Sequence, residues 1–360
     1  MRVWLAAAAL LSGSLISLAT ASGAQAAPTL LFDAADGRVF YAEDADNQWH
    51  PASVTKVMTA YVVFEAIKAG KIKLDDKITC SEKAFLQQPS KVGLPVGGEL
   101  TVQKGLEALI IKSANDVAVM LAEVVGGSEE VFVQKMNDTA QRLGMTRTKF
   151  INPNGLPAPD QVTTARDLAK LARAVVKDYP EYAQLWTMSE MRLGKMRLGS
   201  HNSLLRSFQG ADGLKTGFIC DSGFNVIASA TRDGRRLMAI VLGSPTGRER
   251  TIRAANLLEY GFAAYAWKAM FNPQTVDSLP LASDAKSVVS VRQTVLSYEC
   301  GTIKPRAVAT RRAKAKARRA KAAAEKDGGA TKQEAPAAEK AKPPVQASSA
   351  TSGAAATKAQ

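Results

Sequence analysis

The sequence predicts an α/β protein of the α+β type, with one antiparallel sheet flanked by helices and a helical insertion between its strands. Strand-like runs lie near both ends of the globular part of the chain, whereas the long stretch between them has mainly helical periodicity. In addition, the strands at the second end are apolar on both faces. A sheet with two apolar faces needs cover on both sides, which the helices can supply.

Two hairpins are predicted, at residues 29–41 and 224–243. Each has an Asp-Gly pair at its centre, Asp36-Gly37 in the first and Asp233-Gly234 in the second. Asp-Gly favours the tight turn of a hairpin, because glycine readily adopts the positive φ angle that this turn requires. The order along the chain therefore predicts a sheet assembled from the beginning and the end of one domain.

Five segments between and after the hairpins have apolar residues at helical spacing. The first of them is bounded by residues that suit helix ends, since Pro51 fits a first turn and Gly70 fits a stop. The last one follows the second hairpin, so we expect it to pack back on the sheet. The five predicted helices span residues 51–69, 106–125, 131–143, 166–176 and 251–271.

The two ends of the chain differ in composition from the part between them. Residues 1–26 have the features of a secretory signal, with Arg2 before an apolar stretch and Ala24-Gln25-Ala26 at the cleavage position. An uncleaved membrane anchor is the alternative. We expect an exported protein of the periplasm or cell envelope, with no transmembrane anchor after signal cleavage. Residues 305–360 are rich in Ala, Lys, Arg and Pro and are predicted to be a disordered basic tail.

Between these ends we place a folded domain over residues 27–271 and a short extension over residues 272–304. Most of the formal net charge of +14 lies beyond the domain, because residues 301–360 contribute +10 of it. The domain is only mildly basic, and no nucleic-acid partner is expected. The basic run at residues 311–321 could bind anionic envelope polymers or lipid head groups, or it could be a solvated linker.

Cysteine and histidine are rare in this chain. Export permits disulfides, but the three cysteines are an odd number, so at least one of Cys80, Cys220 and Cys300 stays unpaired or pairs with another chain. Cys220 could be a structural residue bonded to Cys300, or a functional thiol. With only His50 and His201, and no Cys-x-x-Cys spacing, we expect no metal and no cofactor. A Ser-His-Asp triad would require one of these two histidines.

The first of three chemically suggestive patterns is Ser53-Val-Thr-Lys56. Positions i and i+3 share one face of a helix, with Cβ atoms roughly 5–6 Å apart. A lysine amine can accept the proton of a serine hydroxyl if burial and a cationic neighbour lower its pKa. Ser53 would also lie in the first helical turn, where the helix dipole favours negative charge. The same spacing recurs at Ser283 and Lys286, so this pattern is weak alone.

The second pattern is Ser113-Ala-Asn115, a polar cluster at a break between apolar helical stretches. Its hydroxyl could shuttle a proton, and its amide could hold a substrate amide. A plain helix N-cap is the alternative, because Ser and Asn are both preferred there. Ser200-His-Asn202 repeats the pattern.

The third pattern is Lys215-Thr-Gly217, which occurs once, just before the second hairpin, and is predicted to lie on an edge strand. A lysine and a threonine hydroxyl together can hold a carboxylate. The glycine would let the backbone of a ligand approach the strand closely.

The three patterns follow one another along the chain and are predicted to lie at a helix start, at a helix break and on a strand. In this order and these positions they resemble the motifs of the penicillin-recognising active-serine enzymes. The neighbouring residues narrow the resemblance to the low-molecular-mass D-alanyl-D-alanine carboxypeptidases, a family of penicillin-binding proteins, over Thr29 to Tyr265. The resemblance implies a β-lactamase/transpeptidase-like fold. It rests on the segments Pro51-Ala-Ser-Val-Thr-Lys-Val-Met-Thr-Ala, Lys112-Ser-Ala-Asn-Asp-Val-Ala, Asn152-Pro-Asn-Gly-Leu, Asp212-Gly-Leu-Lys-Thr-Gly-Phe and Val241-Leu-Gly-Ser-Pro.

The resemblance also implies a role for each motif residue. Ser53 would form an acyl-enzyme with the D-Ala-D-Ala end of a peptidoglycan stem peptide, after Lys56 takes its proton. Ser113 and Asn115 would pass a proton to the leaving amine and orient the peptide. Penicillins and other β-lactams, which mimic the D-Ala-D-Ala end, should acylate the same serine. The substrate carboxylate and the oxyanion would be held by Lys215, Thr216, Gly217 and Phe218, with the backbone N–H groups of Ser53 and Phe218 as the oxyanion hole.

Departures from the family pattern leave alternatives open. Many members carry an all-β domain of about a hundred residues after the catalytic one, for which residues 272–300 are too few. A serine β-lactamase of the commonest class would need a Glu-x-x-Leu-Asn pattern between the second and third motifs, and residues 115–215 have none. A D,D-endopeptidase that cuts cross-links would share all three motifs. A catalytically dead wall-binding protein is disfavoured, because the motif residues are intact.

Overall fold

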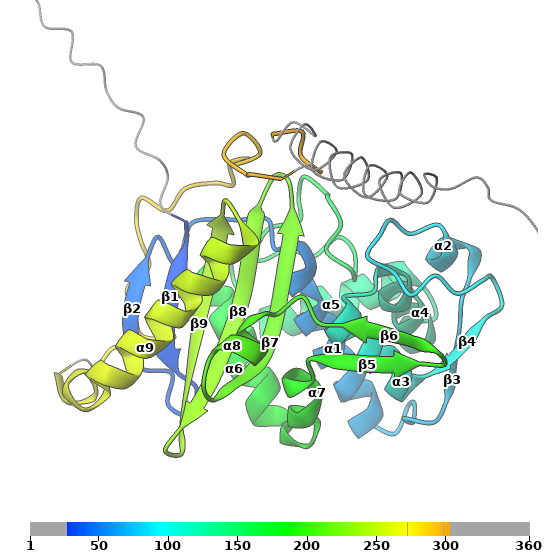
Figure 1. The fold of residues 1–360 in the computed structure, drawn as a ribbon, viewed down its shortest axis with the longest axis horizontal. Helices are drawn as coiled ribbons and strands as arrows, with labels where there is room; N and C mark the ends of the chain where they lie inside the picture. Colours follow the sequence, from blue (N-terminus) through cyan, green and yellow to red (C-terminus); the bar gives the residue numbers. More distant parts are fainter. Residues whose placement is uncertain (1–26, 272, 298, 303–360) are drawn as a thin grey trace, which may run out of the picture. The chain divides into compact units, whose positions relative to one another are not determined.

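The computed structural model describes residues 27–302 except 272 and 298 (Figure 1). The predicted signal segment and basic tail lie outside the described residues. The main sheet has five strands in the order β2-β1-β9-β8-β7, and all neighbours are antiparallel. The expected α+β class is therefore confirmed. The strands are β1 (Thr29–Asp33), β2 (Val39–Glu43), β7 (Ala211–Ile219), β8 (Gly223–Arg232) and β9 (Arg235–Ser244).

The sheet joins the two ends of the domain, as the sequence predicts. β1 pairs with β9, and each of the two predicted hairpins forms, as β1–β2 and as β8–β9. The strand β7, which carries the Lys215-Thr-Gly217 pattern, adds to β8 and lies at the edge of the sheet. One side of β7 is therefore open to a ligand, and the site described below lies there.

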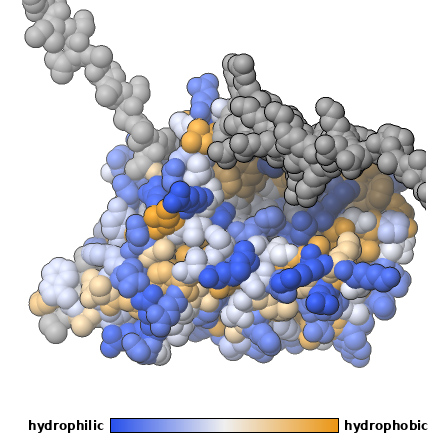
Figure 2. Space-filling model, viewed as in Figure 1, coloured by the Kyte–Doolittle hydropathy of each residue, from blue (hydrophilic) through white to orange (hydrophobic). Residues whose placement is uncertain are grey.

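Helices cover the sheet on both faces, which explains why its strands are apolar on both sides. Successive side chains of a strand point to opposite faces. Leu30 of β1 and Met238 of β9 pack with helices α1 (Lys56–Lys68) and α6 (Ala165–Asp178), whereas Leu31 and Leu237 pack with α9 (Gly247–Phe271). In Figure 1, α9 lies across the near face of the sheet, and α6 lies on the far face. Figure 2 shows the outer surface on this side of the molecule, where hydrophilic residues surround apolar patches.

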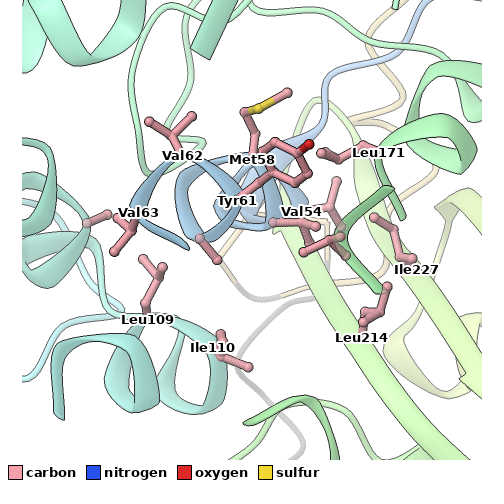
Figure 3. Close-up of a cluster of buried hydrophobic side chains, with 14 of the residues drawn as sticks. Val54, Met58, Tyr61, Val62, Val63, Leu109, Ile110, Leu171, Leu214 and Ile227 are labelled. Carbon is pink, nitrogen blue, oxygen red and sulfur yellow. The ribbon is translucent and has the colours of Figure 1, made fainter. Parts of the chain in front are cut away.

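The helix α1 is the centre of the larger core. It is buried on nearly all sides, with Val57, Met58, Val63 and Phe64 inaccessible to solvent. Figure 3 shows its side chains between Leu109 and Ile110 on one side and sheet residues such as Ile227 on the other. This burial fixes the start of α1, and hence the first motif, against both the sheet and the helical insertion.

The helical stretch predicted at residues 106–125 forms as separate helices, with the break at the Ser113-Ala-Asn115 cluster that the sequence indicates. The α-helix α3 (Val102–Glu107) passes into a π-helical turn at Ala108–Lys112, and α4 begins at Asn115 and ends at Gly126. Between them Ser113 has φ 62°, a left-handed conformation that costs about 1 kcal/mol or more for a residue with a side chain. Such π-turns inside helices frequently mark functional sites.

The other predicted helices form with shifted ends. The start of the first is a 3-10 turn (Ala52–Thr55) that precedes α1, and α5 spans Glu129–Arg142. Short elements of three to five residues carry too little periodicity to be predicted. They are β3 (Lys77–Thr79), α2 (Glu82–Phe85), β4 (Glu99–Thr101), a 3-10 turn (Pro180–Tyr182), α7 (Ala183–Thr187), β5 (Glu190–Leu193), β6 (Met196–Gly199) and α8 (Leu204–Ser207).

The residues after α9 form an ordered segment along one end of the sheet, shown in tan and orange in Figure 1. We call residues 273–302 the C-terminal strap; its description leaves out residue 298. Its first part is held by the buried ion pair of Arg166 and Asp46, since the Arg166 guanidinium donates to the carbonyls of Val276 (3.0 Å) and Leu279 (2.7 Å). Within residues 27–302, no helix has the length and apolar composition needed to cross a membrane.

Candidate active site

The first motif lies in a strained turn at the start of α1. Ala52 has φ 50°, in the left-handed region, and Ser53 follows it in the 3-10 turn. Two glycines allow other segments to approach this turn. A Cβ atom at Gly155 would lie 2.0 Å from the Ala52 carbonyl oxygen, and one at Gly217 would lie 3.0 Å from Ser53 N. We expected Gly217 to make room for a ligand, but the crowding at this glycine comes from the Ser53 turn.

Lys56 reaches the Ser53 hydroxyl as the i, i+3 spacing predicts. Its Nζ lies 3.0 Å from Ser53 Oγ, 2.7 Å from Asn115 Oδ1 and 2.5 Å from the carbonyl oxygen of Asn154. The side chain is fully buried. Burial, and then the neighbouring charge of Lys215, lower the pKa of Lys56 well below its ordinary value, against a weaker opposing effect of Asp116. The amine therefore has a basic lone pair within reach of the serine proton.

The second and third motifs meet at Lys215. Its Nζ donates to Ser113 Oγ at 2.9 Å and to the Thr216 carbonyl at 3.0 Å, and its side chain is also buried. Burial, and then the charge of Arg250, lower the pKa of Lys215 to about 7. The left-handed conformation of Ser113 ends the π-turn here, where its hydroxyl meets the edge strand.

The Asn115 side chain links two parts of the site. Its Oδ1 accepts from Lys56, and its Nδ2 donates to the Gln88 carbonyl at 2.8 Å, so both ends of the amide are engaged within the protein. The residue thus connects Lys56 to the loop that follows α2. Ser90 of this loop accepts the Asn115 backbone N–H at 2.7 Å and donates its hydroxyl to the Lys112 carbonyl at 2.9 Å.

A cleft of about 540 Å³ opens over these groups. Six of the eight predicted site residues line it, while the other two, Lys56 and Lys215, lie buried behind its wall. The lining residues are Ser53, Pro89, Ser90, Lys112, Ser113, Asn115, Gly155, Leu156, His201, Thr216, Gly217, Phe218, Ile219, Phe224, Gly247, Arg250, Ser297 and Glu299. Within the described residues, no group of His, Cys, Asp and Glu side chains has the arrangement of a metal site.

Comparison with known sequences agrees with this geometry. The sequence model of the D-alanyl-D-alanine carboxypeptidases matches residues 17–246. The chain belongs to this family. DacC of Escherichia coli is 40% identical over 240 residues, which cover 65% of this chain and 60% of that protein. DacF of Bacillus subtilis is 31% identical over 300 residues, which cover 81% of this chain and 74% of DacF. The chain thus aligns with only about three fifths of the length of DacC.

Solved structures of similar proteins share the fold. Penicillin-binding protein 5 from Haemophilus influenzae has a TM-score of 0.64 at 35% identity, covering 66% of this chain and 71% of that one. A penicillin-binding protein from Listeria monocytogenes, in its cefotaxime-bound form, has a TM-score of 0.61 at 32% identity, covering 66% of this chain and 97% of that one. The β-lactamase/transpeptidase-like fold expected from the motifs is therefore confirmed.

Three groups at the active site of this carboxypeptidase family member belong to none of the three sequence motifs. Arg250, in the first turns of α9, lines the cleft and donates to the His201 carbonyl at 3.2 Å. Burial lowers the pKa of Arg250 to about 10, so it remains a cation at neutral pH. The Asn154 carbonyl contacts Lys56, and Glu299 of the strap lines the cleft. In the sequence, only the family resemblance singles out the segment around Asn154 and Gly155.

The strap is fixed beside the cleft by a disulfide between Cys220 and Cys300. Of the two alternatives for Cys220, the disulfide with Cys300 is therefore confirmed, and the functional thiol is not. Cys80 is the remaining free thiol among the described residues, and it is buried. Burial raises the pKa of the Cys80 thiol, which disfavours a reactive thiolate.

Proposed function

We propose that this chain is a serine-type D-Ala-D-Ala carboxypeptidase, a hydrolase that removes the terminal D-alanine from peptidoglycan stem peptides. The observation that carries the proposal is the buried Lys56 amine, with a lowered pKa, 3.0 Å from the hydroxyl of Ser53. A serine hydroxyl becomes a competent nucleophile when an adjacent base can take its proton.

In the acylation step, Ser53 Oγ attacks the carbonyl carbon of the penultimate D-alanine, and the proton passes to Lys56 Nζ. The carbonyl oxygen becomes an oxyanion, for which the N–H groups of Ser53 and Phe218 are the donors. The adjacent wall supports this role, because β7 approaches so closely that a Cβ atom at Gly217 would lie 3.0 Å from Ser53 N. One such donor typically stabilises a transition state by about 3–4 kcal/mol.

Collapse of the tetrahedral intermediate breaks the peptide C–N bond. Ser113 donates its hydroxyl proton to the leaving nitrogen and regains a proton from Lys56, which becomes neutral again. D-alanine leaves as the free amino acid. Water then attacks the ester carbonyl and gives a proton to Lys56. The bond between the acyl carbon and Ser53 Oγ breaks, Lys56 returns its proton to Ser53 Oγ, and the shortened peptide leaves with a free carboxylate. Asn115 acts in this scheme as a positioning residue, because its Oδ1 holds the Lys56 amine.

The cationic end of the cleft suits a peptide with a free carboxylate. Thr216 lines the cleft, Lys215 lies directly behind it, and Arg250 adds a buried permanent charge. A desolvated cation binds a carboxylate more strongly than an exposed one does. We therefore assign the terminal carboxylate of the substrate to Thr216, Lys215 and Arg250. β-Lactams carry a carboxylate beside a strained amide, and they should acylate Ser53 at the same place.

The proposal is tested by release of D-alanine from a synthetic peptide that ends in D-Ala-D-Ala. Wild-type protein should release one D-alanine per peptide, and Ser53→Ala should release none while keeping the wild-type circular dichroism spectrum. Cleavage of purified cross-linked muropeptides, measured in parallel, shows whether endopeptidase activity accompanies it. Rapid turnover of penicillin, with no long-lived adduct, would instead support a β-lactamase.

We place this activity in the periplasm or cell envelope, where peptidoglycan lies. The basic residues 311–321 support an electrostatic attachment to anionic envelope surfaces. Deletion of residues 305–360 should then weaken binding to isolated sacculi or anionic vesicles, and unchanged binding would refute the attachment.

A further inference from the structure

The strands β5 and β6 form a separate two-stranded hairpin, which Figure 1 shows on the near side of the molecule, apart from the main sheet. The inner face of this hairpin is apolar. Met191 is buried there, and Leu193 and Leu198 pack on the larger core. Successive side chains of a strand point to opposite faces. The outer face, which carries Arg192 and Arg197, therefore points to solvent.

This outer face has an excess of positive charge. Arg192 and Arg197 lie directly opposite each other in the register of the two strands, and Lys195 lies in the turn that joins them. A hydrogen bond from Arg197, and then the charges of three nearby arginines including Arg206 of α8, lower the pKa of Glu190. One carboxylate thus serves a cluster of four exposed cations. We call Arg192, Lys195, Arg197 and Arg206 the basic face.

Three of these four cations lack a counter-charge. Arg197 pairs with Glu190, but Arg192, Lys195 and Arg206 form no ion pair with any residue that the structure describes. Like charges directly opposite each other destabilise a pair of strands. The basic face therefore costs the hairpin stability within the protein alone, and an external anion would offset that cost.

The β8–β9 hairpin shows how the same arrangement is compensated elsewhere in this chain. Arg232 and Arg235 lie opposite each other there. Arg232 pairs with Glu259 at 2.9 Å, and the Arg235 guanidinium lies 4.3 Å from the centre of the Tyr265 ring. Both arginines of that pair have a partner within the domain, whereas Arg192 has none.

We propose that the basic face is a docking surface for a phosphate-bearing polymer. The planar guanidinium group of arginine matches the geometry of a phosphate and binds it through two parallel hydrogen bonds. Side chains directly opposite each other on paired strands have Cβ atoms about 5 Å apart, so Arg192 and Arg197 can reach one phosphate together. A phosphate monoester carries nearly two negative charges at neutral pH, whereas a carboxylate carries one.

A polymer fits this surface better than a lipid bilayer does. A surface that binds the membrane interface combines cations with apolar side chains that enter the acyl region. In this hairpin Met196 is exposed, but Met191, Leu193 and Leu198 face the core. No residue of the basic face lines the catalytic cleft, so a bound polymer would hold the domain and leave the cleft free.

The test measures binding of full-length protein to fluorescently labelled long-chain inorganic polyphosphate. The variant Arg192→Glu/Lys195→Glu should bind about ten times more weakly than wild type, because one exposed ion pair contributes up to about fivefold. The difference should shrink as salt is added, since exposed charges are screened. Poly-L-glutamate of equal length should bind the wild type more weakly than polyphosphate does. The variant should also resist denaturant at least as well as wild type, because Glu at position 192 faces Arg197.

Lys71→Glu/Lys73→Glu is the matched control, because both lysines are exposed, neither forms an ion pair with a described residue, and the change in net charge is the same. It should bind polyphosphate within about twofold of wild type. The basic tail is identical in all three proteins, so it cannot produce a difference between them.

Unchanged affinity in Arg192→Glu/Lys195→Glu, or an equal loss in the lysine control, would overturn the docking surface. Equal affinity of wild type for poly-L-glutamate would overturn the assignment to phosphate. Vesicles of phosphatidylglycerol and phosphatidylcholine are titrated in parallel. Binding to these vesicles that depends on Arg192 and Lys195, without binding to polyphosphate, would overturn the polymer and assign the basic face to a membrane.

Discussion

Replacement of Gly155 by alanine should impair catalysis without any change to a motif residue. Gly155 has φ +83°, and a Cβ atom there would lie 2.0 Å from the oxygen and 2.4 Å from the carbon of the Ala52 carbonyl. Heavy atoms do not approach Cβ closer than about 3.0 Å, so the Ala52–Ser53 backbone must move by about 1 Å. A misplacement of this size typically lowers a catalytic rate about a hundredfold. We therefore expect Gly155→Ala to acylate Ser53 about a hundred times more slowly.

The matched control is Gly127→Ala. Gly127 has a similar φ, +77°, at the end of α4, but no atom lies within 4 Å of the position of its Cβ. Both variants bear the cost of alanine at positive φ, about 1–2 kcal/mol in unfolding free energy. Only Gly155→Ala bears the clash as well.

The assay is the rate of covalent labelling by a fluorescent penicillin, with denaturant unfolding of the same samples. Gly127→Ala should label at the wild-type rate with a small loss of stability. Wild-type labelling by Gly155→Ala, with no more destabilisation than Gly127→Ala shows, would refute the argument that this glycine holds the serine turn in place.

Three further predictions concern charge and cross-links. Protonated Lys215 attracts the substrate carboxylate and its pKa is about 7, so kcat/KM should fall as pH rises through that value. Because the charge of Arg250 lowers the pKa of Lys215, Arg250→Gln should move this fall to higher pH. An identical pH profile in the variant would contradict this electrostatic coupling. Arg166→Met leaves the Asp46 carboxylate buried without its partner, so it should lower the free energy of unfolding by about 3–5 kcal/mol in a denaturant titration. A loss below about 1 kcal/mol would show that the ion pair is dispensable for stability. The Cys220–Cys300 disulfide closes a sequence separation of 80, so Cys300→Ser should lower the free energy of unfolding by about 4 kcal/mol on the loop-entropy model. Cys80→Ser, measured in the same titration, keeps the disulfide, so reductant should still lower the stability of that variant.

The sequence was sufficient for the sheet and for the three motifs. Alternating apolar residues and Asp-Gly turns predict the hairpins, because strand pairing depends on just these local features. The i, i+3 spacing predicts the contact of Ser53 with Lys56, since it reflects helix geometry alone. The family resemblance implies one site for all three motifs, but the contact of Lys215 with Ser113 was not predicted.

The remaining features depend on tertiary contacts that leave little trace in the sequence. The polar cluster at Ser113 indicates a break in the helical stretch, but the π-turn and the left-handed conformation that form this break have no periodicity of their own in the sequence. The carbonyl of Asn154 is a backbone group, and any residue carries one. Arg250 is one of many arginines until the packing of α9 brings it to the cleft. The strap has no periodicity, because it is held by discrete hydrogen bonds and a disulfide.

The central claim is that Ser53 is the nucleophile and Lys56 its base, and one measurement tests both. Wild-type protein and Lys56→Met are incubated with penicillin, and the adduct is followed over time and located by mass spectrometry of peptides. We expect a single adduct on Ser53 in the wild type and a rate at least about a hundred times lower in Lys56→Met, since a positioned base contributes roughly 10²–10⁴-fold. An adduct on another residue, or labelling of Lys56→Met at the wild-type rate, would contradict the account.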